Sequence, residues 1–586
     1  MKRYLVTVTV LALASLALAE PFVWLNAWTT AAPGEAVYGG TFRDYDTSDP
    51  RTFNPFVSAE QNALLDLADT GGASLLTRGP DSDEWLPYAA ESFTVSEDGL
   101  VVEVVLRDNI KWSDGTPVTV QDYLFRYQAE TDPEVQSNGF DGWFIEDEPI
   151  LLEQVGENGL RFTFPVADRT AFFKLAIHRP SPDHILGELY REGGAEALRG
   201  AWGTETPLSE TVWTSPWIPT AYTPGERLVF ERNPTFGEWN VDEQGNALPY
   251  LDTYTILLVE SGDAALNLYL AGELDAFSPR TLDDIGVINV AVQNGDIDAT
   301  VIENASPVAS SQFIVFNWNK ASDPVKEGLF RASEFRQAMS HLVDREAITE
   351  LVYGGAASPM WTSVYQVYTF WVNEDTAKFG YDPEAATELL AGLGFDQKNA
   401  DGVLTDGEGN ALAITLATNA GNTQREQIAQ IFADSARESG VDVEVQALDF
   451  NLLVDQLLST GPDRPFDAIL IGLRGGSRDW PFGASVVPCD GNLHMYNQDL
   501  DAGCLTSEEQ EAEELYVQGR KTLDTQAARE IGLEIQRIEA ELQPIIYTVS
   551  PNGHYSWLTS LRGEHPSEFV NAIVGSRELV LTFKAE

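Results

Sequence analysis

The chain has 586 residues, of which 43% are hydrophobic and 10% aromatic, so it is too long for one hydrophobic core and should form two or three domains. Its 36 basic and 91 acidic residues give a formal net charge of −55. A surface this negative repels phosphate backbones and anionic lipids, which argues against nucleic-acid binding. The acidity is typical of a highly soluble protein or of a protein from a salty habitat. Electrostatic steering of a cationic ligand is the alternative, but ionic screening makes its contribution small.

The first 19 residues have the order of a secretory signal peptide. Lys2-Arg3 is the positive start, Tyr4–Leu18 is the apolar stretch, and Ala17-Leu18-Ala19 is a small-x-small cleavage site. The apolar stretch of about 15 residues is shorter than the roughly 20 that a membrane-spanning helix needs. Glu20 follows where a lipoprotein would have cysteine. We therefore expect a cleaved signal peptide and a mature chain in the periplasm or another extracytoplasmic space, without a lipid anchor.

Before residue 84, a strand should begin at Tyr38, a loop with two prolines covers Ser48–Pro55, and a helix is expected over Ala59–Thr70. The run from Glu84 to Glu130 then has the most specific order of elements in the chain. Its expected elements are a strand over 92–95, a polar turn over 96–99, a strand over 100–106, a turn cluster over 111–117 and a helix from Val120. Thr119 should cap that helix.

The second half of the chain predicts a parallel sheet. The strands expected there and just before it cover 254–259, 413–418, 442–448, 466–471, 545–549 and 578–583, and the helices cover 264–270, 334–342, 345–353, 384–391 and 423–439. Ser333 and Asp344 should cap two of these helices, and Gly354-Gly355 should end one. Strand, helix and strand over 413–448 form a β-α-β crossover, which implies parallel strands.

The Glu84–Glu130 run, EWLPYAAESFTVSEDGLVVEVVLRDNIKWSDGTPVTVQDYLFRYQAE, resembles the signature of the family 5 extracellular solute-binding proteins, the dipeptide and oligopeptide receptors of ABC importers. Phe335–Pro359, FRQAMSHLVDREAITELVYGGAASP, is similar to another segment of that family. The strand Tyr38–Arg43 and the loop behind it resemble the family's opening, in which the loop lies beside the ligand cleft. The resemblance covers about residues 38 to 583.

The resemblance implies an α/β fold of the periplasmic-binding-protein type II (cluster C), with two lobes joined by a two-crossover hinge and an extra family-specific domain. The implied parts are a discontinuous first lobe over 22–75, 206–305 and 546–586, the extra domain over 76–205, and a second lobe over 306–545. The strands at 545–549 and 578–583 should both return to the first lobe. Closure around a ligand would be a hinge rotation of the lobes.

The implied function is capture of a solute by a monomeric receptor and its delivery to ABC permease subunits at the inner membrane. Peptide is the expected ligand; oligosaccharide is the alternative, followed by nickel or opines. The chain has no G-x-S-x-G elbow, P-loop or H-E-x-x-H motif, and its six histidines are scattered, so we expect neither an enzyme nor a cofactor. A secreted hydrolase, and a chaperone or signalling receptor on the same fold, are the competing classes.

The strongest candidate for ligand contact is the glycine-rich loop that follows the strand over 466–471. Ligands of open α/β sheets lie outside the carboxyl ends of strands. In peptide receptors of this family an aspartate in a comparable loop pairs with the ligand's α-amino group, which suggests that role for Asp479, with Arg478 and Trp480 beside it. Alternatively, Asp479 only turns the loop or pairs with Arg478.

Further candidates come from aromatic and polar residues elsewhere. The aromatic cluster after residue 359 consists of Trp361, Tyr365, Tyr368, Phe370 and Trp371. Such a cluster suits a tolerant cleft or stacking on sugar rings, and it equally suits ordinary core packing. Asn54 belongs to the loop expected beside the cleft. His494 lies in a segment similar to one found in a branch of the family with oligosaccharide-binding members, although a satisfied loop histidine is the alternative.

The two cysteines and one acidic run are expected to have structural roles. Cys489 and Cys504 are the only cysteines, and in an exported protein they should form a disulfide. The run Gln397–Glu408 is similar to an EF-hand loop, with Asn399, Asp401 and Glu408 at ligand positions. The first position is Gln397 where the loop normally has Asp. We therefore expect a hairpin turn there, with calcium binding as the alternative, and no dedicated metal site.

Overall fold

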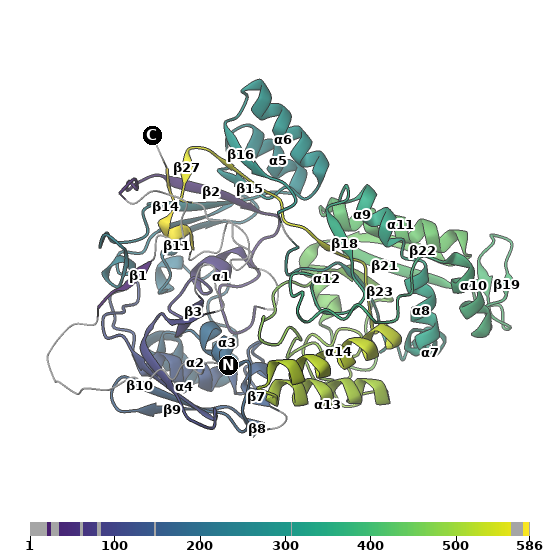
Figure 1. The fold of residues 1–586 in the computed structure, drawn as a ribbon, viewed down its shortest axis with the longest axis horizontal. Coiled ribbons are helices and arrows are strands. Elements are labelled where there is room, and N and C mark those ends of the chain that lie inside the picture. The colour runs from purple at the N-terminus through teal and green to yellow at the C-terminus, as the bar shows by residue number, and fades with distance from the viewer. Residues whose placement is uncertain are drawn as a thin grey trace.

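The computed structural model describes residues 20–24, 34–58, 62–78, 84–145, 148–305, 307–563 and 578–584. The expected signal peptide lies outside these residues. Figure 1 shows two bodies side by side, with the purple, blue and teal part of the chain in one and the green part in the other. We use the names first lobe, extra domain and second lobe for the regions defined above.

The first lobe contains two small sheets. One has the order β11-β12-β14-β2, and the other has the order β15-β26-β16. Their strands are β2 (Thr41–Asp46), β11 (Trp217–Thr223), β12 (Arg227–Arg232), β14 (Thr253–Leu258), β15 (Ala276–Phe277), β16 (Ala299–Ile302) and β26 (Tyr555–Leu558). Helices α5 (Gly262–Leu270) and α6 (Leu282–Asn294) pack with the second sheet. The short helix α1 (Ala63–Ala68) is capped by the Asn62 side chain.

The extra domain is built on the antiparallel sheet β5-β6-β10-β9. Its strands are β5 (Ala90–Val95), β6 (Val101–Leu106), β9 (Leu151–Val155) and β10 (Gly159–Thr163), and its helices are α2 (Val120–Glu130), α3 (Ala171–Ile177) and α4 (Glu188–Arg199). Thr119 and Asp122 form a reciprocal capping box at α2, which confirms the predicted cap. One continuous hydrophobic core joins this domain to the first lobe, from Phe22 to Phe583.

The second lobe contains a five-stranded sheet with the order β22-β21-β23-β17-β24. Its strands are β17 (Phe313–Phe316), β21 (Ala413–Asn419), β22 (Asp442–Leu448), β23 (Ala468–Ile471) and β24 (Ile545–Tyr547). Its helices are α7 (Pro324–Arg331), α8 (Ser333–His341), α9 (Arg345–Leu351), α10 (Pro383–Gly392), α11 (Thr423–Glu438), α12 (Phe450–Leu457), α13 (Ser507–Lys521) and α14 (Thr525–Leu542). β21 and β22 are parallel, as the β-α-β pattern predicts.

Several local predictions are corrected. Ile545–Tyr547 does not return to the first lobe, because β24 pairs with β17 inside the second-lobe sheet. The chain re-enters the first lobe at β26, which pairs with β15 and β16. Residues Glu578–Leu581 form a 3-10 helix before the short strand β28 (Phe583–Lys584). Ser333 is the first residue of α8 and makes no cap, whereas Asp344 caps α9 as predicted.

The C-terminal end of α13 lies against the extra domain. The side chains of Asp168 and Arg520 form an ion pair at 2.8 Å and are 0% and 6% exposed. The Arg169 backbone N–H donates to the Arg520 carbonyl at 3.0 Å, and the Arg169 guanidinium donates to the Thr522 carbonyl at 2.7 Å. Helix C-termini leave carbonyls without intrahelical partners, so a loop of the extra domain completes this end of α13.

Among the described residues, no helix combines the length and the apolar character that crossing a bilayer requires.

Candidate functional site

The loop that follows β23 brings Asp479 to the junction between the second lobe and the extra domain. The Asp479 Oδ2 atom accepts hydrogen bonds from Arg78 Nη2 at 2.9 Å and from Ser477 Oγ at 3.2 Å. The side chains of Arg78 and Asp479 are 19% and 29% exposed. Asp479 therefore pairs with an arginine of the extra domain, and not with the neighbouring Arg478 that the sequence offered as its partner.

A second arginine of the extra domain holds the backbone of this loop. Arg169 Nε donates to the Asp479 carbonyl at 2.5 Å, in addition to the contact with Thr522. Its guanidinium lies 5.0 Å from the ring centre of Trp371 and 6.0 Å from that of Trp480. The loop is thus fixed from the opposite body by one arginine on the carboxylate and by another on the main chain.

The two tryptophans support the loop from inside. Trp480 is 2% exposed and packs so closely on α13 that a Cβ at Gly519 would lie 2.1 Å from its ring. Trp371 is 4% exposed, and its Nε1 donates to the Arg478 carbonyl at 2.8 Å. Neither ring presents a free face to a solute in this conformation, so the packing interpretation describes them better than stacking on a sugar.

The other aromatic candidates are divided among different roles. The Tyr368 hydroxyl donates to the Gly475 carbonyl at 3.2 Å, while Tyr365 belongs to the second-lobe core and is 8% exposed. Trp361 stacks with the guanidinium of the buried Arg345 at 4.2 Å. Phe370 is exposed and lies under Arg529. Of this cluster, Tyr365, Tyr368 and Trp371 are the residues that the structure brings to the glycine-rich loop.

Asn54 and His494 are buried, and their side chains make internal contacts. The Asn54 amide donates to the carbonyls of Leu198 and Ala201 at 2.6 and 3.1 Å. A ring nitrogen of His494 lies 3.2 Å from the Glu509 carboxylate, and both side chains are 0% exposed. In this conformation these two residues hold loops in place and do not face a solute.

Residues from both bodies also approach one another near α1. Asp66 is in the first turn of α1 in the first lobe, and Arg474 lies in the glycine-rich loop of the second lobe. Desolvation raises the pKa of Asp66 to about 6, and the charge of Arg474 opposes that rise. Sequence reasoning missed Arg78, Arg169 and Asp66, because nothing in their local pattern shows which distant loop they meet.

The cysteine pair and the EF-hand-like run have the predicted structural forms. Cys489 and Cys504 are joined by a disulfide with a Cα–Cα distance of 5.2 Å. Residues 397–398 pair with 404–405 as a hairpin. The Asn399 side chain accepts the backbone N–H groups of Asp401 and Val403 inside that turn. Its oxygen is therefore already used by the turn.

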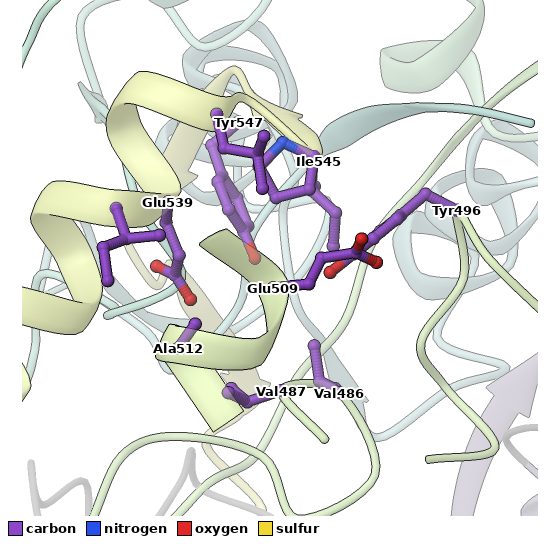
Figure 2. A pocket seen from close by; sticks show the side chains of 11 residues that line it. Val486, Val487, Tyr496, Glu509, Ala512, Glu539, Ile545 and Tyr547 are labelled. Atoms are coloured by element: carbon purple, nitrogen blue, oxygen red, sulfur yellow. The ribbon is translucent and has the colours of Figure 1, made fainter. Parts of the chain in front are cut away.

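A separate cavity of about 30 Å³ lies inside the second lobe, beneath α13 and α14. Figure 2 shows the Tyr547 ring extending between Glu539 and Glu509 at this cavity, with Tyr496 beside them. The volume has room for only one or two water molecules. This cavity is therefore too small to hold a peptide or an oligosaccharide.

The fold is that of the two-lobed type II periplasmic-binding proteins. Two solved structures have this fold at 21% sequence identity. AppA from Bacillus subtilis, in complex with a nonapeptide, has a TM-score of 0.78 over 94% of this chain and 100% of its own. MelB from Agrobacterium fabrum C58, in complex with stachyose, has a TM-score of 0.81 over 96% of this chain and 87% of its own.

The family follows from sequence. Residues 84–487 match the model of the middle part of the bacterial extracellular solute-binding proteins, family 5. A probable ABC transporter-binding protein of Deinococcus radiodurans is 39% identical over 585 residues, which covers 97% of this chain and 98% of that protein. The chain belongs to family 5 of the extracellular solute-binding proteins. It is a substrate-binding component of an ABC transporter and not an enzyme.

Proposed function

We propose that this protein captures peptides in the periplasm as a monomer and delivers them to the permease of its ABC transporter. Asp479 would bind the α-amino group of the peptide. The observation that carries this proposal is the geometry of the Asp479 carboxylate. Its Oδ2 atom is occupied by Arg78 and Ser477, while no described residue donates a hydrogen bond to Oδ1. An acceptor oxygen at the junction of the second lobe and the extra domain suits an ammonium group.

The comparisons add indirect support. AppA of Bacillus subtilis, an oligopeptide-binding protein, is 24% identical to this chain over 546 residues. The likeness to MelB keeps oligosaccharide as the second candidate, and one observation favours it. Arg78 already balances the charge of Asp479, and a carboxylate paired in this way accepts hydrogen bonds from neutral hydroxyl groups.

Isothermal titration calorimetry with three kinds of probe tests the proposal. A mixed set of short peptides with free N-termini should bind, the same peptides with acetylated N-termini should bind weakly, and stachyose should not bind. Asp479→Asn should weaken the free-amino peptides about 10- to 100-fold, because it removes a charge-assisted hydrogen bond of about 1.5–3 kcal/mol. Binding of stachyose with no response to any peptide would refute the proposal in favour of the second candidate.

A further inference from the structure

The ion pair between Arg78 and Asp479 joins residues from two different bodies. Arg78 is the last residue of β3 (Leu76–Arg78), which pairs with β4 (Trp85–Pro87) as a hairpin. Its guanidinium lies 4.1 Å from the ring centre of Trp85, so its own hairpin helps to position the charged group. The charged end reaches Asp479 at 2.9 Å. A residue outside the second lobe therefore supplies the counter-ion of the carboxylate that the proposed function assigns to the solute.

A guanidinium and an ammonium group compete for such a carboxylate. Each is stabilised by the same negative charge, and two cations beside one carboxylate repel each other. Both side chains of the pair are partly exposed, so the pair itself contributes little stability. The backbone of the loop does not depend on Arg78, because Arg169 holds the Asp479 carbonyl separately.

We propose that Arg78 is a specificity-determining residue: it is the internal counter-ion of Asp479, and it competes with the cationic group of the solute for the charge of that carboxylate. The solute class is then a molecule with a primary ammonium group, such as the free N-terminus of a peptide. This inference rests on the proposed function. It adds that the ammonium group at Oδ1 and Arg78 at Oδ2 compete for one negative charge, so that Arg78 weakens the binding of a cationic end group and leaves a neutral one unaffected.

The test is calorimetric titration of Arg78→Met, which removes the charge and keeps an unbranched apolar side chain. Free-amino peptides should bind this variant about two- to fivefold more tightly than the wild-type protein, the range expected for one partly exposed ion pair. Acetylated peptides should bind both proteins equally. Arg78→Lys should restore wild-type affinity. Arg161→Met, which breaks a pair with Glu103 on the exposed sheet of the same domain, is the matched control and should change nothing.

Two results would overturn the inference. The first is a loss of affinity for free-amino peptides in Arg78→Met, which would mean that Arg78 supports the solute. The second is an equal change for free-amino and acetylated peptides. A wild-type protein that binds neither peptide would instead refute the proposed function.

The interaction between Arg78 and Asp479 can be tested without any solute. The melting temperatures of Arg78→Met, Asp479→Asn and the double variant should be non-additive, because the two residues are in direct contact. Additive shifts would show that the Arg78–Asp479 pair does not form, and would overturn the inference independently of any ligand.

Discussion

Replacing Glu539 with glutamine should stabilise the second lobe at neutral and alkaline pH. Glu539 lies on α14 beside the small cavity of Figure 2. Its carboxylate accepts hydrogen bonds from the Ser363 backbone N–H at 3.1 Å and from the Ser363 hydroxyl at 2.9 Å. No basic side chain among the described residues forms an ion pair with it. Because burial disfavours the ionised form, the pKa of Glu539 rises from 4.5 to about 7.

The magnitude follows from that difference in pKa. About 2.5 pH units at 1.36 kcal/mol each give roughly 3 kcal/mol. The folded state holds the proton more tightly than the unfolded chain, so ionisation favours unfolding. The destabilisation is absent below pH 4.5, grows as the pH rises to about 7 and is complete above it. Glutamine cannot ionise, and its amide oxygen still accepts the hydrogen bonds from Ser363. The variant should therefore gain about 3 kcal/mol at pH 8 and less than about 1 kcal/mol at pH 5.

Differential scanning calorimetry at both pH values measures this gain. For a lobe of about 240 residues, the unfolding entropy converts 3 kcal/mol into an increase of about 6 °C in the melting temperature. Glu534→Gln on the same helix is the control. The hydrogen bond with Arg537 lowers the pKa of Glu534, so its replacement should not stabilise the protein at pH 8. A Glu539→Gln variant that melts at or below the wild-type temperature at pH 8 would refute the reasoning.

Three further outcomes are expected in the same assay. Asp168→Asn should lower the free energy of unfolding by about 3–5 kcal/mol, because Arg520 keeps a buried charge without its partner. Adding Arg520→Met should recover much of that loss, and an unchanged melting temperature in the single variant would contradict the reasoning. Reducing the Cys489–Cys504 disulfide should lower the free energy of unfolding by about 3 kcal/mol, because the disulfide closes a loop of 15 residues. An intact mass that shows two free thiols before reduction would contradict the pairing. Burial opposes ionisation of Glu130, but neighbouring basic side chains outweigh it and lower its pKa to about 2. Glu130→Gln should therefore destabilise the protein at pH 7, and the loss should shrink as the pH falls from 4.5 towards 2; an equal loss at pH 7 and pH 3 would contradict this.

The parts of the fold that sequence predicted well depend on local chemistry. Thr119 and Asp122 are three residues apart and cap α2 together, so their pattern is complete within one turn. The β21-α11-β22 crossover is likewise carried by one continuous segment. The error at Ile545–Tyr547 has a physical reason. A buried apolar strand looks the same in either lobe, and its partner β17 lies more than two hundred residues earlier.

The candidate site was predicted only in part, for the same reason. The position of Asp479 in the loop that follows a strand is visible from sequence, whereas its partner Arg78 is 401 residues away. His494 and Glu509 are both buried, and nothing near His494 in the chain shows that a carboxylate on α13 will meet it. Trp371 is a possible stacking surface by sequence, but in the structure it is 4% exposed and donates to the Arg478 carbonyl. Sequence gives the residue types of a loop, and tertiary packing decides which of them remain accessible.

The contact between the C-terminal end of α13 and the extra domain allows separation of the two bodies to be measured without attaching a label. The carbonyls of Arg520 and Thr522 accept hydrogen bonds from Arg169 only while the extra domain stays in place. Any parting of the two bodies would return those carbonyls to water, and the last turn of the helix would fray. The rate of amide hydrogen exchange in the final turn of α13 would then report how often the two bodies separate. Comparing that exchange with and without a solute would give the fraction of time the receptor spends open.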